Sequence, residues 1–240
     1  MATNGGAGEV RRAALARLEV FSSLTEAERG VVAQQARIRR FVKGRVVVRQ
    51  GEAADATFGV ITGRLRVSLS RANGSEITLA ILGPGELCGE LGLFQDGSRS
   101  ARISTLDDAS LLVVNKANFL LILESSAAGS LALCRLLAAR VRKLARHLDE
   151  VTAMPVEQRL ARQLLILVDR WGEPAPGGVG ISLQLSQQDF ADLADTTRQS
   201  VNQCLARWRQ SGIVTSTPGR VIVSDLRRLR DAASSSSRKY

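Results

Sequence analysis

Short strand-like segments between residues 38 and 114 constrain the fold of this chain most strongly. They are rich in valine, isoleucine, leucine and threonine, and turns that carry glycine, asparagine or aspartate separate them. The segments are RVVV at 45–48, FGVIT at 58–62, LRVSLS at 65–70, ITLAIL at 77–82, ARISTL at 101–106 and SLLVV at 110–114. Many short strands at near-regular spacing predict a β-barrel or jelly roll. Asn73-Gly74 is a favourable hairpin turn within it.

Helical periodicity flanks this β region on both sides. Residues 9–36 show it in two short pieces, and Ser23 with Glu26 fits a capping box at the start of the second piece. Downstream, a narrow apolar stripe has the alternating spacing of three and four residues that is typical of a coiled coil. Its members are Cys134, Leu137, Val141, Leu144, Leu148 and Val151. The stripe predicts a parallel coiled-coil homodimer, and the alternative is one amphipathic helix packed on its own domain.

Met154-Pro155 interrupts the helical pattern and marks a hinge into a second domain. The elements predicted after it are, in chain order, a helix at 156–170, a loop at 172–180, a strand at 181–185, helices at 186–194 and 197–210, and a hairpin at 213–223 that turns at Pro218-Gly219.

The segment GELGLFQDGSRSA at residues 89–101 carries side chains suited to a cyclic phosphodiester. A short helical turn starting at Gly89 offers backbone N–H groups to a phosphate. Arg99 can donate a fork of hydrogen bonds to phosphate oxygens, and Ser100 adds a hydroxyl donor. Glu90 only accepts hydrogen bonds and suits a ribose 2′-hydroxyl. We therefore predict ligand contacts from Gly89, Glu90, Leu91, Arg99 and Ser100.

The segment TTRQSVNQCL at residues 196–205 fits a helix that enters a DNA groove. A capping pattern of Ser186 with Asp189 starts the helix before it, and a tight turn follows at 195–196. A buried face of Val201, Leu205 and Trp208 leaves polar residues on the other side, near the helix start, where base edges are reached. The candidate DNA-binding residues are Arg198, Gln199, Asn202 and Gln203 for bases, and Ser186, Gln188 and Thr197 for phosphates.

The charge balance agrees with a polyanionic partner, since 33 Lys and Arg face 23 Asp and Glu and the net charge is +10. Cys88, Cys134 and Cys204 lie far apart and His147 is the single histidine, which argues against disulfides, metal sites and triad chemistry.

No apolar run approaches the roughly 20 residues of a membrane span. We therefore expect a cytoplasmic protein without membrane contact or cofactor. The ends at 1–8 and 232–240 are expected to be disordered.

The order of the GELGLF and RSA motifs and the TTRQSV helix resembles the Crp/Fnr family, the cAMP receptor protein-like bacterial transcription factors, over residues 18–230. The resemblance implies an α+β fold: an N-terminal cyclic-nucleotide-binding β-roll (jelly roll) at 1–129, a long dimerisation helix at 130–153 and a C-terminal winged helix-turn-helix at 154–240. It also implies that Gly89, Glu90, Arg99 and Ser100 hold the sugar-phosphate.

Two parts of the chain depart from the family pattern. Leu144 and Ala145 stand where cAMP-responsive members place a threonine and a serine that contact the adenine, and neither side chain can form a hydrogen bond. Leu144 remains a predicted ligand contact, and the effector is predicted to be cAMP or cGMP. The recognition helix has RQSV where the family has RETV, so Gln199 stands in place of a glutamate that accepts from cytosine.

These observations predict a homodimeric regulator that binds palindromic double-stranded DNA under the control of a cyclic mononucleotide, with RNA polymerase as a further candidate partner. One alternative is a constitutive DNA-binding regulator with a vestigial or non-nucleotide pocket. Another is a signalling module whose C-terminal domain binds a protein. An enzyme is disfavoured because the sequence offers no nucleophile–base pair, metal cluster or P-loop.

Overall fold

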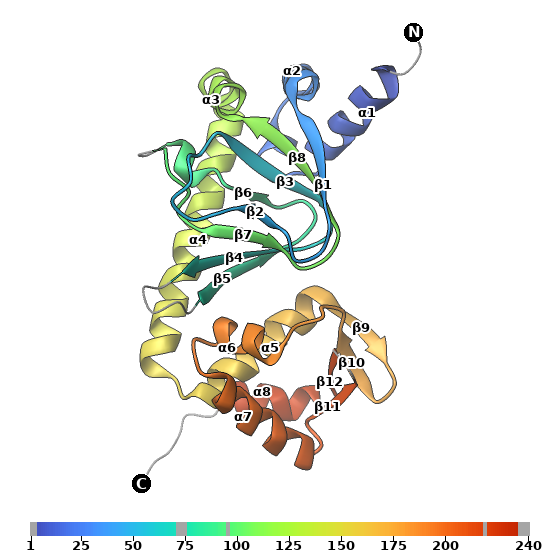
Figure 1. The fold of residues 1–240 in the computed structure, drawn as a ribbon, viewed down its shortest axis with the longest axis vertical. Helices are drawn as coiled ribbons and strands as arrows, with labels where there is room; N and C mark the ends of the chain where they lie inside the picture. Colours follow the sequence, from blue (N-terminus) through green and yellow to red (C-terminus); the bar gives the residue numbers. More distant parts are fainter. Residues whose placement is uncertain (1–3, 71–75, 95–96, 218–219, 235–240) are drawn as a thin grey trace. The chain divides into compact units, whose positions relative to one another are not determined.

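The computed structural model describes residues 4–70, 76–94, 97–217 and 220–234, and the chain divides into two compact units, Met1–Lys143 and Leu144–Tyr240 (Figure 1). The elements of the first unit are α1 (Asn4–Leu15), η1 (Phe21–Ser23), α2 (Glu26–Gln35), β1 (Arg37–Phe41), β2 (Val46–Val48), β3 (Ala56–Thr62), β4 (Leu65–Ser70), β5 (Glu76–Leu82), β6 (Leu87–Cys88), η2 (Leu91–Leu93), β7 (Arg102–Thr105), β8 (Ala109–Asn115) and α3 (Lys116–Ser125). The long helix α4 (Ala127–Ala153) continues from the first unit into the second.

Two antiparallel four-stranded sheets form the β-roll of the first unit, with strand orders β1-β8-β3-β6 and β2-β7-β4-β5. Inward side chains of both sheets, such as Phe58, Leu65 and Leu111, make one apolar core. The predicted jelly roll is confirmed. Strands β1 and β6 escaped prediction because RIRRF is mostly charged and β6 has only two residues. The turn at Asn73-Gly74 lies outside the described residues, although β4 and β5 on either side of it pair.

A second core lies between the β-roll and the helices α1, α2 and α3. The Phe21 and Phe119 rings meet edge to face there, with centroids 5.9 Å apart. The predicted Ser23–Glu26 capping box is wrong. Thr25 is the N-cap of α2, and its backbone N–H donates to Glu28 Oε2 at 2.6 Å. Because Ser23 belongs to the preceding η1 turn, its hydroxyl donates to the Val20 carbonyl instead.

The expected disorder of the two ends is wrong in part. Helix α1 already begins at Asn4, and α8 (Leu226–Ser234) continues through residues 232–234. Leu229 and Ala233 bury one face of α8, which a search for tails by composition does not detect. The remaining residues of the predicted tails, 1–3 and 235–240, lie outside the described part of the chain.

After α4, the second unit contains α5 (Val156–Trp171), β9 (Gly172–Ala175), β10 (Gly178–Ile181), α6 (Gln187–Leu193), α7 (Arg198–Gln210), β11 (Val214–Thr217), β12 (Arg220–Val223) and α8. Its four-stranded sheet has the order β11-β12-β10-β9. The predicted helices and the β11–β12 hairpin are confirmed, and the Pro218-Gly219 turn lies outside the described residues.

The predicted loop at 172–180 and strand at 181–185 are wrong. Strands β9 and β10 pair as a hairpin across most of the supposed loop, and only Ile181 of the supposed strand is in a strand. A Cβ at Gly178 would collide with the Val223 carbonyl oxygen of the neighbouring strand. Glycine therefore serves close strand packing here rather than flexibility.

Among the described residues, no single helix is long and apolar enough to cross a membrane. Only α3 and α4 taken together reach the length and apolar composition of a span, and they are bent by 111° relative to each other.

Candidate functional site

Glycines allow the two ends of the 89–101 segment to approach each other. Gly89 has a φ of +81°, and a Cβ there would lie 2.9 Å from an Arg99 guanidinium nitrogen. A Cβ at Gly92 would collide with the Ser98 carbonyl oxygen. The helical turn predicted at Gly89 starts slightly later, because Glu90 is the N-cap of η2. The backbone thus brings Arg99 against the start of this turn, as the sequence predicts.

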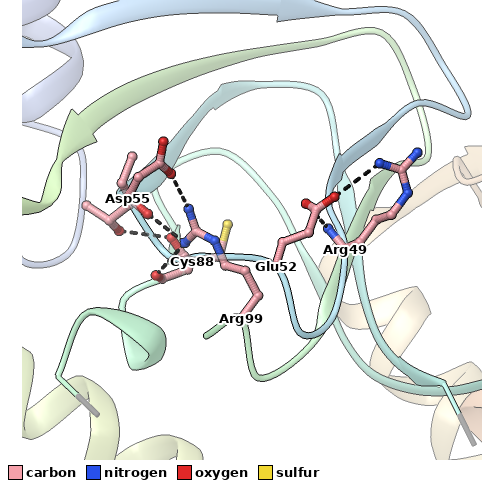
Figure 2. A network of polar contacts seen from close by, with 8 residues as sticks. Arg49, Glu52, Asp55, Cys88 and Arg99 are labelled. Carbon is pink, nitrogen blue, oxygen red and sulfur yellow. Dashed lines mark hydrogen bonds and ion pairs between the residues drawn. The ribbon is translucent and has the colours of Figure 1, made fainter. Parts of the chain in front are cut away.

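Arg99 is buried, with 4% of its surface exposed, and its guanidinium is held by the protein. One terminal nitrogen donates to the carbonyl oxygens of Ala56 at 2.7 Å and Gly89 at 2.9 Å. The other donates to Asp55 Oδ1 at 2.9 Å (Figure 2). Nε is buried and has no hydrogen-bond partner. The arginine is therefore fixed in place while one of its donors is unsatisfied.

Glu90 is the second buried charge of the site, with 1% of its surface exposed. Its Oε1 accepts a hydrogen bond from Arg140 of α4, which also donates to the Leu87 carbonyl. Its Oε2 is buried without a partner. The sequence does not predict that Arg140 contacts Glu90, because a contact across 50 residues depends on where α4 packs.

The other predicted ligand residues differ in their surroundings. Leu91 lies on η2 with 45% of its surface exposed, and Ser100 is exposed next to Arg99. Leu144 belongs to the second compact unit and is 58% exposed. Cys88, next to Gly89, is buried, and burial together with the Glu90 charge raises the pKa of its thiol to about 12. The described residues contain no group of three or more His, Cys, Asp or Glu side chains that could hold a metal ion.

The predicted seam on α4 is mostly exposed in the single chain. Val141, Leu144 and Leu148 have 66%, 58% and 64% of their surface exposed. Cys134 is also exposed and Val151 is half-buried, whereas Leu137 packs partly against the core between β-roll and helices. His147 of the same helix is half-buried.

The helix-turn-helix begins and turns as the sequence predicts. Ser186 caps α6 in a reciprocal capping box with Asp189, at 3.1 and 2.7 Å. Asp195 in the turn has a φ of +46°, and it is the one described residue other than glycine with a positive φ. Thr197 caps α7 by accepting from the Ser200 backbone N–H at 3.1 Å. These local signals set the geometry of the turn.

The two faces of α7 are also confirmed. Val201, Leu205 and Trp208 are buried, and Cys204 is buried beside them. The opposite face presents the exposed residues Arg198, Gln199 and Gln203 and the half-buried Asn202. Arg198 Nε donates to Gln187 Oε1 at 3.3 Å.

The three predicted phosphate contacts lie at or near the starts of these two helices. The side chains of Ser186, Gln188 and Thr197 are exposed. The Gln188 amide donates to Asp192 Oδ1 at 2.8 Å, so it is partly engaged within α6.

The start of α5 contributes two residues that the sequence did not single out. Glu157 accepts from Trp208 and Arg207 of α7, and Arg159 donates to the carbonyl oxygens of Ala194 and Asp195 at the turn and of Met154 after α4. Charged residues in the first turn of a helix are common, so no local sequence pattern marks Glu157 and Arg159 as residues that contact α7 and the turn before it.

Comparison with known proteins agrees with this architecture. Residues 38–126 match the family model of the cyclic nucleotide-binding domain, and residues 158–232 match that of the Crp-like helix-turn-helix domain. The cyclic AMP receptor protein of Thermus thermophilus is 31% identical over 195 residues, 81% of this chain and 87% of that protein. A CRP-like cAMP-activated global transcriptional regulator of Mycobacterium tuberculosis is 27% identical over 215 residues, 90% and 96% of the two chains. The crystal structure of a CRP-family transcriptional regulator, also from Thermus thermophilus, superposes with a TM-score of 0.72 at 24% identity, covering 82% of this chain and 97% of that one.

A cyclic-nucleotide-binding β-roll followed by a Crp-like helix-turn-helix defines a class of DNA-binding transcription regulators, not of enzymes. This chain belongs to the CRP/FNR family of transcriptional regulators, as its sequence motifs predict.

Proposed function

We propose that a cyclic mononucleotide, cAMP or cGMP, binds in the β-roll of this regulator and sets its affinity for DNA. The carrying observation is a pair of buried, oppositely charged side chains beside Gly89, each with an unsatisfied atom: Arg99 Nε and Glu90 Oε2. Buried polar atoms without partners are rare. A cyclic phosphate offers acceptors to Arg99, and a ribose hydroxyl offers a donor to Glu90. Gly89, Leu91 and Ser100 would complete the contacts.

The choice of base is open between adenine and guanine in this proposal. The names of the Thermus and Mycobacterium relatives favour cAMP. Leu144 and the neighbouring Ala145 cannot form hydrogen bonds with either base through their side chains. Both nucleotides therefore have to be tested.

Isothermal calorimetry with cAMP and cGMP tests the pocket. Arg99→Lys keeps the charge but loses the planar fork, and Glu90→Gln keeps the shape but loses the charge. We expect each to weaken binding about tenfold or more, the effect of losing a charged hydrogen bond. Arg64→Lys is the matched control, because Arg64 pairs with Asp107 elsewhere in the same unit. No heat with either nucleotide in the wild-type protein would contradict the proposal.

For DNA, we propose that a homodimer joined along α4 presents two copies of α7 to a palindromic duplex, with half-sites about 34 Å apart. Arg198, Gln199, Asn202 and Gln203 would read bases, and Ser186, Gln188 and Thr197 would contact phosphates. RNA polymerase is a further partner in this proposal. The functional segments would then be residues 1–129 for the effector, 130–153 for dimerisation and 154–240 for DNA.

Selection of duplexes from a random-sequence pool tests the reading residues. Arg198→Ala is expected to relax the preference at one position of each half-site, at a cost of about 1–3 kcal/mol for the preferred base. An unchanged selected sequence would show that Arg198 does not read a base.

A second candidate function is constitutive DNA binding with a vestigial pocket. It is favoured by the ion pairs that the site residues already make, Arg99 with Asp55 and Glu90 with Arg140. Equal DNA affinity with and without either nucleotide would support this candidate.

A further inference from the structure

We propose that Glu157 is a positioning residue that ties the recognition helix α7 to the hinge at the end of α4. The inference rests on the proposed nucleotide control of DNA binding. It adds the residue through which a movement of α4 would reach α7.

Both carboxylate oxygens of Glu157 are committed to α7. Oε1 accepts from the indole Nε1 of Trp208 at 2.9 Å, and Oε2 accepts from Arg207 at 2.7 Å. Trp208 is only 2% exposed, so its N–H depends on an acceptor inside the protein. Bonds to two adjacent residues fix both the position and the rotation of this helix relative to α5.

The place of Glu157 in the chain makes this contact sensitive to the hinge. Helix α4 ends at Ala153, Pro155 is the N-cap of α5, and α5 begins at Val156. Glu157 is therefore in the first turn after the break. A rotation of this turn carries the carboxylate with it, and the short hydrogen bonds to α7 tolerate little displacement.

Arg159, in the same turn, holds the other part of the reading module. Its guanidinium donates to the carbonyl oxygens of Met154 at 2.7 Å, Ala194 at 2.9 Å and Asp195 at 3.0 Å. One side chain thus joins the hinge to the left-handed turn between α6 and α7. Glu157 and Arg159 together attach both ends of the turn-and-helix unit to the start of α5.

The two hydrogen bonds of Glu157 differ in how much each contributes to holding α7. The ion pair with Arg207 is solvent-exposed, since 56% of the Arg207 side chain is accessible, and exposed ion pairs contribute little. The bond to the buried indole is the one that requires Glu157. Glu157→Gln keeps an acceptor for the indole and removes the charge, whereas Glu157→Ala removes both.

The test measures the gain in DNA affinity that nucleotide produces. Fluorescence anisotropy would give the affinity, with and without saturating cAMP or cGMP, for a duplex that the wild-type protein selects from a random pool. All variants carry Trp171→Phe, which leaves Trp208 as the only tryptophan. We expect Glu157→Ala to reduce the gain about fivefold or more, within the usual range of allosteric coupling, and Glu157→Gln to keep most of it.

Two further readouts separate positioning from stability. Nucleotide affinity in the absence of DNA should stay within about twofold of wild type, because losing the link lowers coupling rather than the pocket's own affinity. The Trp208 emission should respond to nucleotide in the wild-type protein and in Glu157→Gln but not in Glu157→Ala. Glu173→Gln is the matched control, since Glu173 lies on β9, beyond the other end of α5 from Glu157, and pairs with Arg220 at 3.2 Å.

If nucleotide raises the DNA affinity of Glu157→Ala as much as that of the wild-type protein, and Trp208 emission still responds to nucleotide, the inference is overturned. An equal loss of gain in Glu157→Ala and Glu157→Gln would overturn the role of the indole bond. If Glu157→Ala does not unfold cooperatively, Glu157→Asp replaces it, and a full gain in that shortened variant would also overturn the inference. A wild-type protein with no gain would reject the proposed nucleotide control, and this coupling with it, before any variant is compared.

Discussion

Arg99 and Glu90 are buried charges that the fold itself stabilises. Removing a charged group from water is costly unless hydrogen bonds or an opposite charge replace the water. Backbone carbonyls and Asp55 do this for Arg99, and Arg140 does it for Glu90. These partners stabilise both charges without a ligand, and the one atom of each side chain that remains unsatisfied is where the proposed nucleotide would bind.

Arg140→Gln is expected to lower the free energy of unfolding by about 1–3 kcal/mol, because it leaves a buried carboxylate without its cation. Urea unfolding followed by circular dichroism measures this loss. Arg142→Gln is the control, since Arg142 is exposed on the same helix. The double variant Glu90→Gln with Arg140→Gln should recover part of the loss, as no charge is then unpaired. Equal stability of the Arg140 and Arg142 variants would disprove the role of the ion pair.

Cys88 should be inert towards alkylation. Burial raises the pKa of its thiol to about 12, so the reactive thiolate is essentially absent at every pH well below that value. We expect iodoacetamide at pH 8 to leave Cys88 unmodified in the folded protein and to modify it in urea. Mass spectrometry of the peptides distinguishes the two, and rapid modification of native Cys88 would show that the β-roll opens easily.

At the scale of single residues, sequence reasoning finds what a motif encodes locally. Gly89, Glu90 and Arg99 come from one segment, and so do the caps Ser186 and Thr197. Contacts such as Arg99 with Asp55, 44 residues apart, follow from the isolated bridge between Ala53 and Ser98, outside the named strands, and have no local signal.

Helix α4 presents the clearest question at the scale of elements. Its apolar row includes Val141 and Leu148, 66% and 64% exposed in the single chain, which is unusual unless a partner covers them. We expect Val141→Asp with Leu148→Asp to convert a dimer into a monomer, because a coiled-coil seam does not accommodate charges at a and d positions. Sedimentation equilibrium measures the mass. The control replaces Arg142 and Arg146, which are exposed and lie off the apolar row, by Gln. A monomeric wild-type protein would show that this row is not a dimer interface.

Elements with a strong period are predictable here, and those defined by their neighbours are not. The alternating strands of the β-roll and the helices α5, α6 and α7 follow from hydrophobic spacing. The sequence of the β9–β10 hairpin predicts a loop because proline and glycine fill it, and only the adjacent β12 explains Gly178. The sequence pattern does not predict helix α8, because its buried face has few residues, Leu229 and Ala233, between charged ones.

At the scale of the whole molecule, α4 continues from the unit that contains the cyclic nucleotide-binding domain into the unit that contains the helix-turn-helix. A ligand controls DNA binding only if it binds the DNA-competent state more tightly than the other state. In the proposed mechanism, this preference is transmitted through α4 and the first turn of α5. This requirement distinguishes a gated regulator from two independent binding modules in one chain.

Thermodynamic linkage gives the whole-molecule prediction. If nucleotide raises the affinity for DNA by some factor, DNA must raise the affinity for nucleotide by the same factor, typically about 5–150-fold. Calorimetric titration of cAMP or cGMP into the protein, free and saturated with its selected duplex, measures the second factor independently of the first. Glu157→Ala should lower both factors together. A factor of one in both directions, with each ligand still bound, would establish two uncoupled modules and favour constitutive DNA binding.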